Sequence, residues 1–152
     1  MNPLLKMLRT LAIAMPLLLL AVNAQADAPD AKPFAEHKLV LQISDADPGR
    51  QTLVLNVANN AIRHYGPEKI DVEIVAFGPG LSLLFADNPN AARIDGLVQD
   101  SGVRFAACGN TVAAVTRMRG EAPVLHPRAI NVDAGVVRIM ELTDAGYTLI
   151  AP

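Results

Sequence analysis

One cysteine is the residue of this chain best suited to chemistry. Cys108 is the single cysteine of 152 residues; it follows the apolar run 103–107 and precedes Gly109, Asn110 and Thr111. A sharp break is expected after the strand, with a helix starting near Thr111. Unpaired N–H groups and the helix dipole favour an anion there, and thiols so placed can have a pKa below the ordinary value of about 8.5. We therefore expect a nucleophilic loop thiol; the alternative is a buried structural thiol, since free cysteine is often buried.

Other catalytic chemistries find little support. A lone cysteine excludes a disulfide framework, a zinc ribbon and a Cys-x-x-Cys redox pair. The histidines, His37, His64 and His126, have no ligand spacing among themselves or to Cys108, so no metal and no cofactor is expected. A Cys–His–Asn triad is also disfavoured, because His126 alone lies near the end of a predicted strand.

The hydrophobic pattern predicts an α/β fold that would place Cys108 at a sheet edge. Short apolar or β-branched runs predict strands at 38–44, 70–77, 103–107, 129–132 and 147–151, and helical periodicity predicts helices at 50–65, 90–100, 111–119 and 135–145. This alternation is typical of a three-layer α/β/α domain with a mostly parallel sheet of about five strands. Loops 45–50, 78–80 and 108–111 leave the carboxyl ends of strands, where ligands bind in such sheets.

Several residues near these loops have both a structural and a functional interpretation. Asn110 and Thr111 are suited to capping the helix after Cys108, and Asn110 could also orient the thiolate. Gly78 and Gly80 flank a proline; they either permit a tight turn or let backbone approach a ligand. Gly109 belongs to the same candidate site.

Further polar residues are better explained by structure. Asn56 and Asn60 share one helix face and are assigned a structural role. Asp45 and Asp47 resemble a carboxylate pair, but beside Pro48-Gly49 we expect them to form a turn and cap the next helix. Arg104 lies on the strand face opposite Val103 and Phe105; it could promote the thiolate, or be exposed or at a subunit contact.

The N-terminus has the features of an export signal. Lys6 and Arg9 precede an apolar run at 11–22, which is too short for a membrane span, and Ala24-Gln25-Ala26 forms a cleavage site. We expect a signal peptide at 1–26, a Pro- and Ala-rich mobile leader at 27–36 and one domain at 37–152, located in the periplasm without stable membrane insertion. An uncleaved membrane anchor is the alternative.

Composition narrows the function classes. Hydrophobic residues make up 51% of the chain, which is too many for a disordered protein. Loss of Lys6 and Arg9 would leave 11 basic against 15 acidic residues. With no cluster of Lys and Arg, we expect no nucleic-acid binding.

A set of short motifs around Cys108 resembles the DsrE/DsrF-like sulfur-relay family. The segment 102–111 (GVRFAACGNT) resembles the family's cysteine motif, and further similarity lies in the asparagine-bearing helix, in 76–80 (AFGPG) and in 135–142 (GVVRIMEL) with Gly146-Tyr147. The resemblance runs from about residue 38 to residue 152. It implies a three-layer domain that forms a homotrimer or homohexamer and carries sulfane sulfur as a persulfide on Cys108.

The resulting functional hypothesis is a periplasmic sulfur carrier or sulfurtransferase. Its partners would be thiol or persulfide donors and acceptors, because no second cysteine is present to discharge Cys108. The alternatives are a non-catalytic oligomeric module that binds a small ligand and a thiol redox sensor. The well-understood relay members are cytoplasmic, so an exported chain departs from that pattern.

Overall fold

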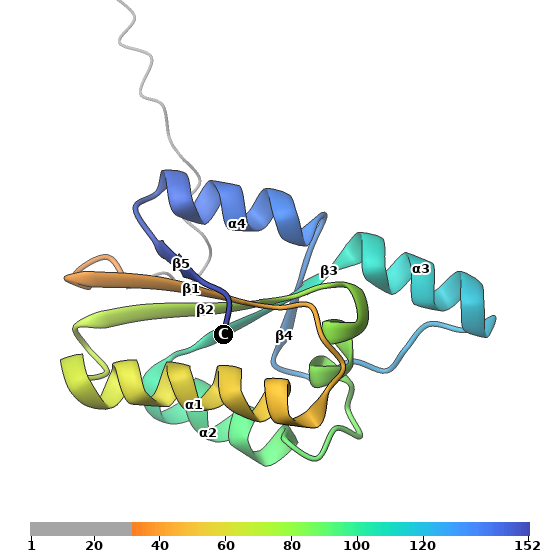
Figure 1. The fold of residues 1–152 in the computed structure, drawn as a ribbon, viewed down its shortest axis with the longest axis horizontal. Coiled ribbons are helices and arrows are strands. Elements are labelled where there is room, and N and C mark those ends of the chain that lie inside the picture. Colours follow the sequence, from red (N-terminus) through yellow and green to blue (C-terminus); the bar gives the residue numbers. More distant parts are fainter. Residues whose placement is uncertain (1–31) are drawn as a thin grey trace, which may run out of the picture.

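A computed structural model describes residues 32–152 and shows a five-stranded sheet between helices (Figure 1). The elements are, in chain order, β1 (His37–Ile43), α1 (Pro48–Tyr65), β2 (Ile70–Ala76), the 3₁₀ segment η1 (Gly78–Leu84), α2 (Ala91–Ser101), β3 (Arg104–Cys108), α3 (Gly109–Arg119), β4 (Ala129–Val132), α4 (Gly135–Asp144) and β5 (Thr148–Ile150). The expected signal peptide at 1–26, and residues 27–31 of the expected leader, lie outside the described residues.

The sheet has the order β4-β3-β2-β1-β5, and every neighbouring pair is parallel. The chain steps in one direction from β1 to β4, and it then returns past β1 to add β5. Right-handed crossovers place helices of opposite step direction on opposite faces. Accordingly α1 and α2 cover one face and α4 covers the other (Figure 1), which confirms the predicted three-layer α/β/α fold.

The two faces of the sheet are packed differently. The face under α1 and α2 holds a wholly hydrophobic cluster that includes Leu41, Leu55 and Phe105, with Val112 of α3 packed at its margin. The α4 face holds a smaller cluster that includes Val75, Ala106 and Ile139. Since strand side chains alternate between faces, Cys108 shares the α4 face with Ala106 and Arg104.

Helix boundaries follow local chemistry in the loops near the carboxyl edge. The Asp47 side chain accepts a hydrogen bond of 2.9 Å from the Arg50 N–H, and Pro48 occupies the first turn of α1. The Asp47 N–H in turn donates to an Asp45 carboxylate oxygen at 2.8 Å. The interpretation of both aspartates as turn and cap residues is confirmed.

Glycines end the first three α-helices of the domain. Gly66, Gly102 and Gly120 follow α1, α2 and α3 with φ of +94°, +59° and +80°, a backbone region that favours glycine. Within residues 32–152, no helix combines the length and the apolar character needed to cross a membrane.

Candidate functional site

Cys108 lies where two helices begin at the carboxyl edge of the sheet. It is the last residue of β3 and the N-cap of α3, so the strand passes into the helix without a loop. The first residue of α4, Gly135, packs against it: a Cβ at Gly135 would lie 3.3 Å from the Cys108 Cβ and 3.1 Å from the Phe77 Cβ. Only a glycine lets the start of α4 come this close without moving its neighbours.

Hydrogen bonds favour the thiolate form of Cys108. Burial alone would raise the pKa of Cys108. The Thr111 hydroxyl and the backbone N–H groups of Gly135, Thr111 and Asn110 act in the opposite direction and bring the pKa below its ordinary value. All four of these groups are neutral donors, and two helix N-termini supply the backbone ones. The thiolate is therefore stabilised as an anion is at a helix N-terminus.

The sulfur is less accessible than the sequence led us to expect. Cys108 is 5% exposed and belongs to a buried strand, so the expectation of a thiol on a loop is wrong. The parallel register pairs Cys108 with Val132 of β4, which extends β3 by one residue beyond its predicted end. The site therefore combines burial of the thiol with a depressed thiol pKa.

Thr111 connects Cys108 to the loop after β2. Its hydroxyl accepts a hydrogen bond of 3.0 Å from the Gly78 N–H and donates a hydrogen bond to the Cys108 sulfur. Gly78 adopts a φ of +53°, which explains the need for glycine at this turn. The side chain of Thr111 thus interacts with the thiol. It does not cap α3 as predicted, because α3 has no side-chain cap.

Two other predicted site residues contribute backbone only. Asn110 is exposed, and its N–H donates to the Asp133 carbonyl at 3.2 Å as well as toward the sulfur. A Cβ at Gly109 would lie 3.1 Å from the Val132 carbonyl oxygen, so Gly109 permits close packing of α3 on β4. Neither capping by the Asn110 side chain nor its orientation of the thiolate is observed.

Gly80 has a structural role. A Cβ on Gly80 would overlap the Ile43 carbonyl at the end of β1, so the close backbone approach predicted for this glycine is toward the chain itself. Gly80 lies in η1 without a positive φ, so this position requires the small size of glycine and not its backbone freedom.

Several residues considered from the sequence lie elsewhere. Arg104 is buried and paired with Asp71 and Glu73, which corrects the expectation of an exposed or subunit-facing side chain and directs its charge away from the thiol. His126 lies 3.8 Å from Asp95 and accepts a hydrogen bond from the Arg128 N–H. Among residues 32–152, no three His, Cys, Asp or Glu residues gather as metal ligands.

The remaining asparagines agree with a structural role. The Asn56 side chain accepts a hydrogen bond of 2.7 Å from Arg93 of α2, and Asn60 is exposed on α1.

A buried network of charged residues on the α4 face was not predicted. Asp71 and Glu73 of β2 are fully buried, and they are paired with Arg104 of β3, Arg138 of α4 and the Tyr147 hydroxyl. Burial and the hydrogen bond to Asp71 raise the pKa of Tyr147 to about 12. Burial would lower the pKa of Arg104, but its two carboxylate partners raise it above the ordinary value.

One signal in the sequence could have indicated this network. Asp71 and Glu73 alternate within an otherwise apolar strand, so both had to lie on one face of a sheet that was expected to be covered by helices. Buried carboxylates need partners, and Arg104 stands at the corresponding place in the next strand, opposite Glu73.

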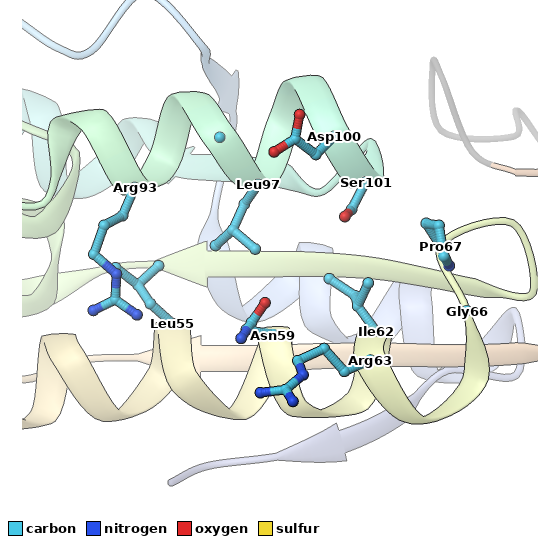
Figure 2. A pocket seen from close by; sticks show the side chains of 11 residues that line it. Leu55, Asn59, Ile62, Arg63, Gly66, Pro67, Arg93, Leu97, Asp100 and Ser101 are labelled. Atoms are coloured by element: carbon cyan, nitrogen blue, oxygen red, sulfur yellow. The ribbon is translucent and has the colours of Figure 1, made fainter.

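A groove of about 520 Å³ lies between α1 and α2, away from Cys108. Figure 2 shows Ile62 of α1 facing Leu97 and Ser101 of α2 across it. The end of α1, together with Ser101 just before β3, places this groove toward the amino edge of the sheet. It is therefore separate from the site at the carboxyl edge.

The fold and the thiol at the carboxyl edge define an α/β domain with a candidate cysteine site. No family model and no curated protein matches the sequence. The chain is similar to a solved structure, the protein of unknown function MTH1491 from Methanobacterium thermoautotrophicum, with 26% identity and a TM-score of 0.66. The match covers 76% of this chain and 99% of that one. It supports the domain architecture and names no activity.

Proposed function

We propose that this protein is a DsrE/DsrF-like sulfur-handling protein that carries or transfers sulfane sulfur as a persulfide on Cys108. The observation that supports this proposal is the set of four neutral hydrogen-bond donors around the sulfur, which lower the pKa of the thiol. The thiolate is the nucleophile in sulfur exchange, and its fraction at neutral pH controls the rate together with its intrinsic nucleophilicity.

The transfer step exchanges one sulfur–sulfur bond for another. The Cys108 thiolate attacks the outer sulfur of a donor persulfide, R–S–SH; the donor S–S bond breaks, R–S⁻ leaves, and Cys108–S–SH forms. An acceptor thiolate then attacks the outer sulfur and restores the Cys108 thiolate. No external oxidant or reductant is required, and the donors that stabilise the initial thiolate also stabilise it as the leaving group in the second step.

Mass spectrometry after incubation with inorganic polysulfide tests this proposal. We expect the protein to gain the mass of one sulfur atom at Cys108, and we expect the Cys108→Ser variant to gain nothing. A thiol acceptor added afterwards should remove the extra mass. A wild-type protein that remains unmodified, while its Cys108 reacts with a small alkylating reagent, would contradict the carrier function.

The low exposure of Cys108 favours a second candidate, a non-catalytic oligomeric module that binds a small ligand. With 5% exposure the thiol can simply fill space beside Phe77 and Gly135. This candidate predicts slow alkylation until denaturant is added and no sulfur adduct. The redox-sensor alternative instead predicts conversion of Cys108 to a sulfenic acid by peroxide.

We propose a homotrimer or homohexamer as the assembled form. Helix α3 has no buried residue, and α4 exposes Val136, Val137 and Met140; such apolar surface is typical of contact with another chain. Light scattering at micromolar concentration should give a mass several times that of the monomer, and a monomer would contradict the assembly.

We also propose export to the periplasm with cleavage after Ala26. The support is the charged start, the apolar run and the small-residue site described above. N-terminal sequencing of the protein from the periplasmic fraction should begin at Asp27; an intact N-terminus in the membrane fraction would contradict this.

A further inference from the structure

Helix α4 is fixed to the sheet by a two-pronged ion pair. The Arg138 Nε lies 2.6 Å from Glu73 Oε1, and its Nη2 lies 2.7 Å from Glu73 Oε2. The Glu73 side chain is fully buried, and that of Arg138 is 13% exposed. A bidentate guanidinium–carboxylate pair fixes direction as well as distance, so it limits both sliding and rotation of the helix.

The same helix packs Gly135 against Cys108, and the Gly135 N–H donates a hydrogen bond to the sulfur. Arg138 follows Gly135 by three residues, about one turn of the helix, and its N–H bonds to the Ala134 carbonyl at 3.0 Å. The fit at the start of α4 is tight, because a Cβ at Gly135 would already be 3.1 Å from Phe77. A small shift of α4 would therefore lengthen or misalign the Gly135 hydrogen bond to the sulfur.

We propose that Glu73 and Arg138 are positioning residues for Cys108, because their ion pair holds the Gly135 N–H against the sulfur. Figure 1 shows the start of α4 and the start of α3 at the same edge of the sheet, where β3 ends. Helix α3 continues directly from Cys108 and needs no such clamp. Helix α4 contacts the thiol only through tertiary packing, and the Glu73–Arg138 ion pair fixes its first turns to β2.

A direct effect of charge on the thiol is the competing explanation. The charged groups in the network are Arg138, Glu141, Glu73, Arg104 and Asp71. Asp133, in the loop before α4, is a further charged residue, and its backbone carbonyl accepts a hydrogen bond from the Asn110 N–H. Variants that keep the charge but alter the geometry separate the two explanations.

Arg138→Lys is the principal variant, since lysine keeps the positive charge and lacks the bidentate fork. The measurement is a spectroscopic titration of the Cys108 thiolate. We expect a thiolate-to-thiol ratio at pH 7 that is about three- to tenfold lower than in wild type, which corresponds to a rise of about half to one unit in the thiol pKa. An unchanged titration curve in folded Arg138→Lys would overturn the proposal, whatever its effect on stability.

Glu73→Gln gives a test of opposite sign. It leaves Arg138 positive and weakly held, so the charge explanation predicts a lower thiol pKa, whereas positioning predicts a higher one. A lower thiol pKa in the folded variant would overturn the proposal. Arg138→Lys decides the question if Glu73→Gln does not fold.

Glu141→Gln is the matched control, because Glu141 is exposed and lies 3.6 Å from Arg138 without holding α4 to the sheet. Its titration should match that of wild type, and a shift as large as that of Arg138→Lys would overturn the assignment to Glu73. These titrations do not involve sulfur transfer. A wild-type protein that fails to accept sulfur while Arg138→Lys still shifts the thiol pKa would reject the carrier function and keep the positioning role.

Discussion

The α4 face of the sheet accommodates charge in two different ways at its two ends. At the carboxyl edge, the Cys108 thiolate would be balanced by neutral donors, the Thr111 hydroxyl and three backbone N–H groups. Toward the amino edge, the carboxylates of Asp71 and Glu73 are balanced by the full charges of Arg104 and Arg138. Neutral donors leave a group able to gain and lose a proton, whereas counter-charges hold the ionised state.

The difference assigns separate tasks to the two ends. The buried ion pairs hold β2, β3 and α4 in one arrangement. The thiol site depends on that arrangement, because one of its donors is the first residue of α4. Disturbing the ion network should therefore alter stability strongly, and disturbing the thiol site should alter the thiol pKa with a smaller effect on stability.

The largest effect is expected from Glu73→Gln. It leaves Arg104 and Arg138 with too little buried negative charge, and breaking a buried pair in this way costs about 3–5 kcal/mol. Urea unfolding measures the loss. Glu36→Gln is the control, because the Glu36–Lys69 pair is 61% exposed on both sides and should contribute less than about 1 kcal/mol. Equal losses in the two variants would contradict the importance of the network.

A moderate effect is expected from Thr111→Val. Valine keeps the shape but removes the hydroxyl that bonds to Cys108 and accepts from the Gly78 N–H. The thiol pKa should rise by roughly half to one unit, and stability should fall by about 1–3 kcal/mol for the unpaired N–H. The thiol pKa is measured from the pH dependence of the alkylation rate. Thr111→Ser keeps a hydroxyl and should stay close to wild type; a thiol pKa that is equal in Thr111→Val and wild type would show that the hydroxyl is irrelevant.

The smallest effect is the pH dependence of stability that Cys108 contributes. The pKa of Cys108 is lower in the folded chain than in the unfolded chain. The thiolate therefore stabilises the folded state in full above the unfolded-state pKa. This stabilisation is lost as the pH falls through the folded-state pKa. The difference in free energy of unfolding between wild type and Cys108→Ser should therefore rise with pH across this interval. Unfolding series at several pH values measure it, and a difference that falls with pH would mean that the native state disfavours the thiolate.

Much of the fold could be predicted from the sequence, because its signals are local. Strands and helices alternate with clear periodicity, and Asp47, Gly66 and Gly102 mark helix ends by chemistry that acts over a few residues. These signals also placed Cys108 at the carboxyl edge of the sheet.

The contacts within the site could be predicted less well. The burial of Cys108 and its contact with Gly135 join β3 to α4, which are distant in sequence, and no periodicity reports such a contact. Arg104 shows the same limit: its strand face was predicted correctly, but its two carboxylate partners depend on the register of β2 against β3. The sequence predicts Thr111 as a helix cap, but tertiary contacts with Gly78 and Cys108 give its hydroxyl a different role.

The most direct test of the account is an ultraviolet titration of the Cys108 thiolate in the native protein. The chain has one cysteine and two tyrosines, so subtracting the curve of Cys108→Ser isolates the thiolate. We predict a midpoint clearly below the value of about 8.5 for a free cysteine. A midpoint at or above that value would show that burial outweighs the four hydrogen bonds and would contradict a reactive thiol at this site.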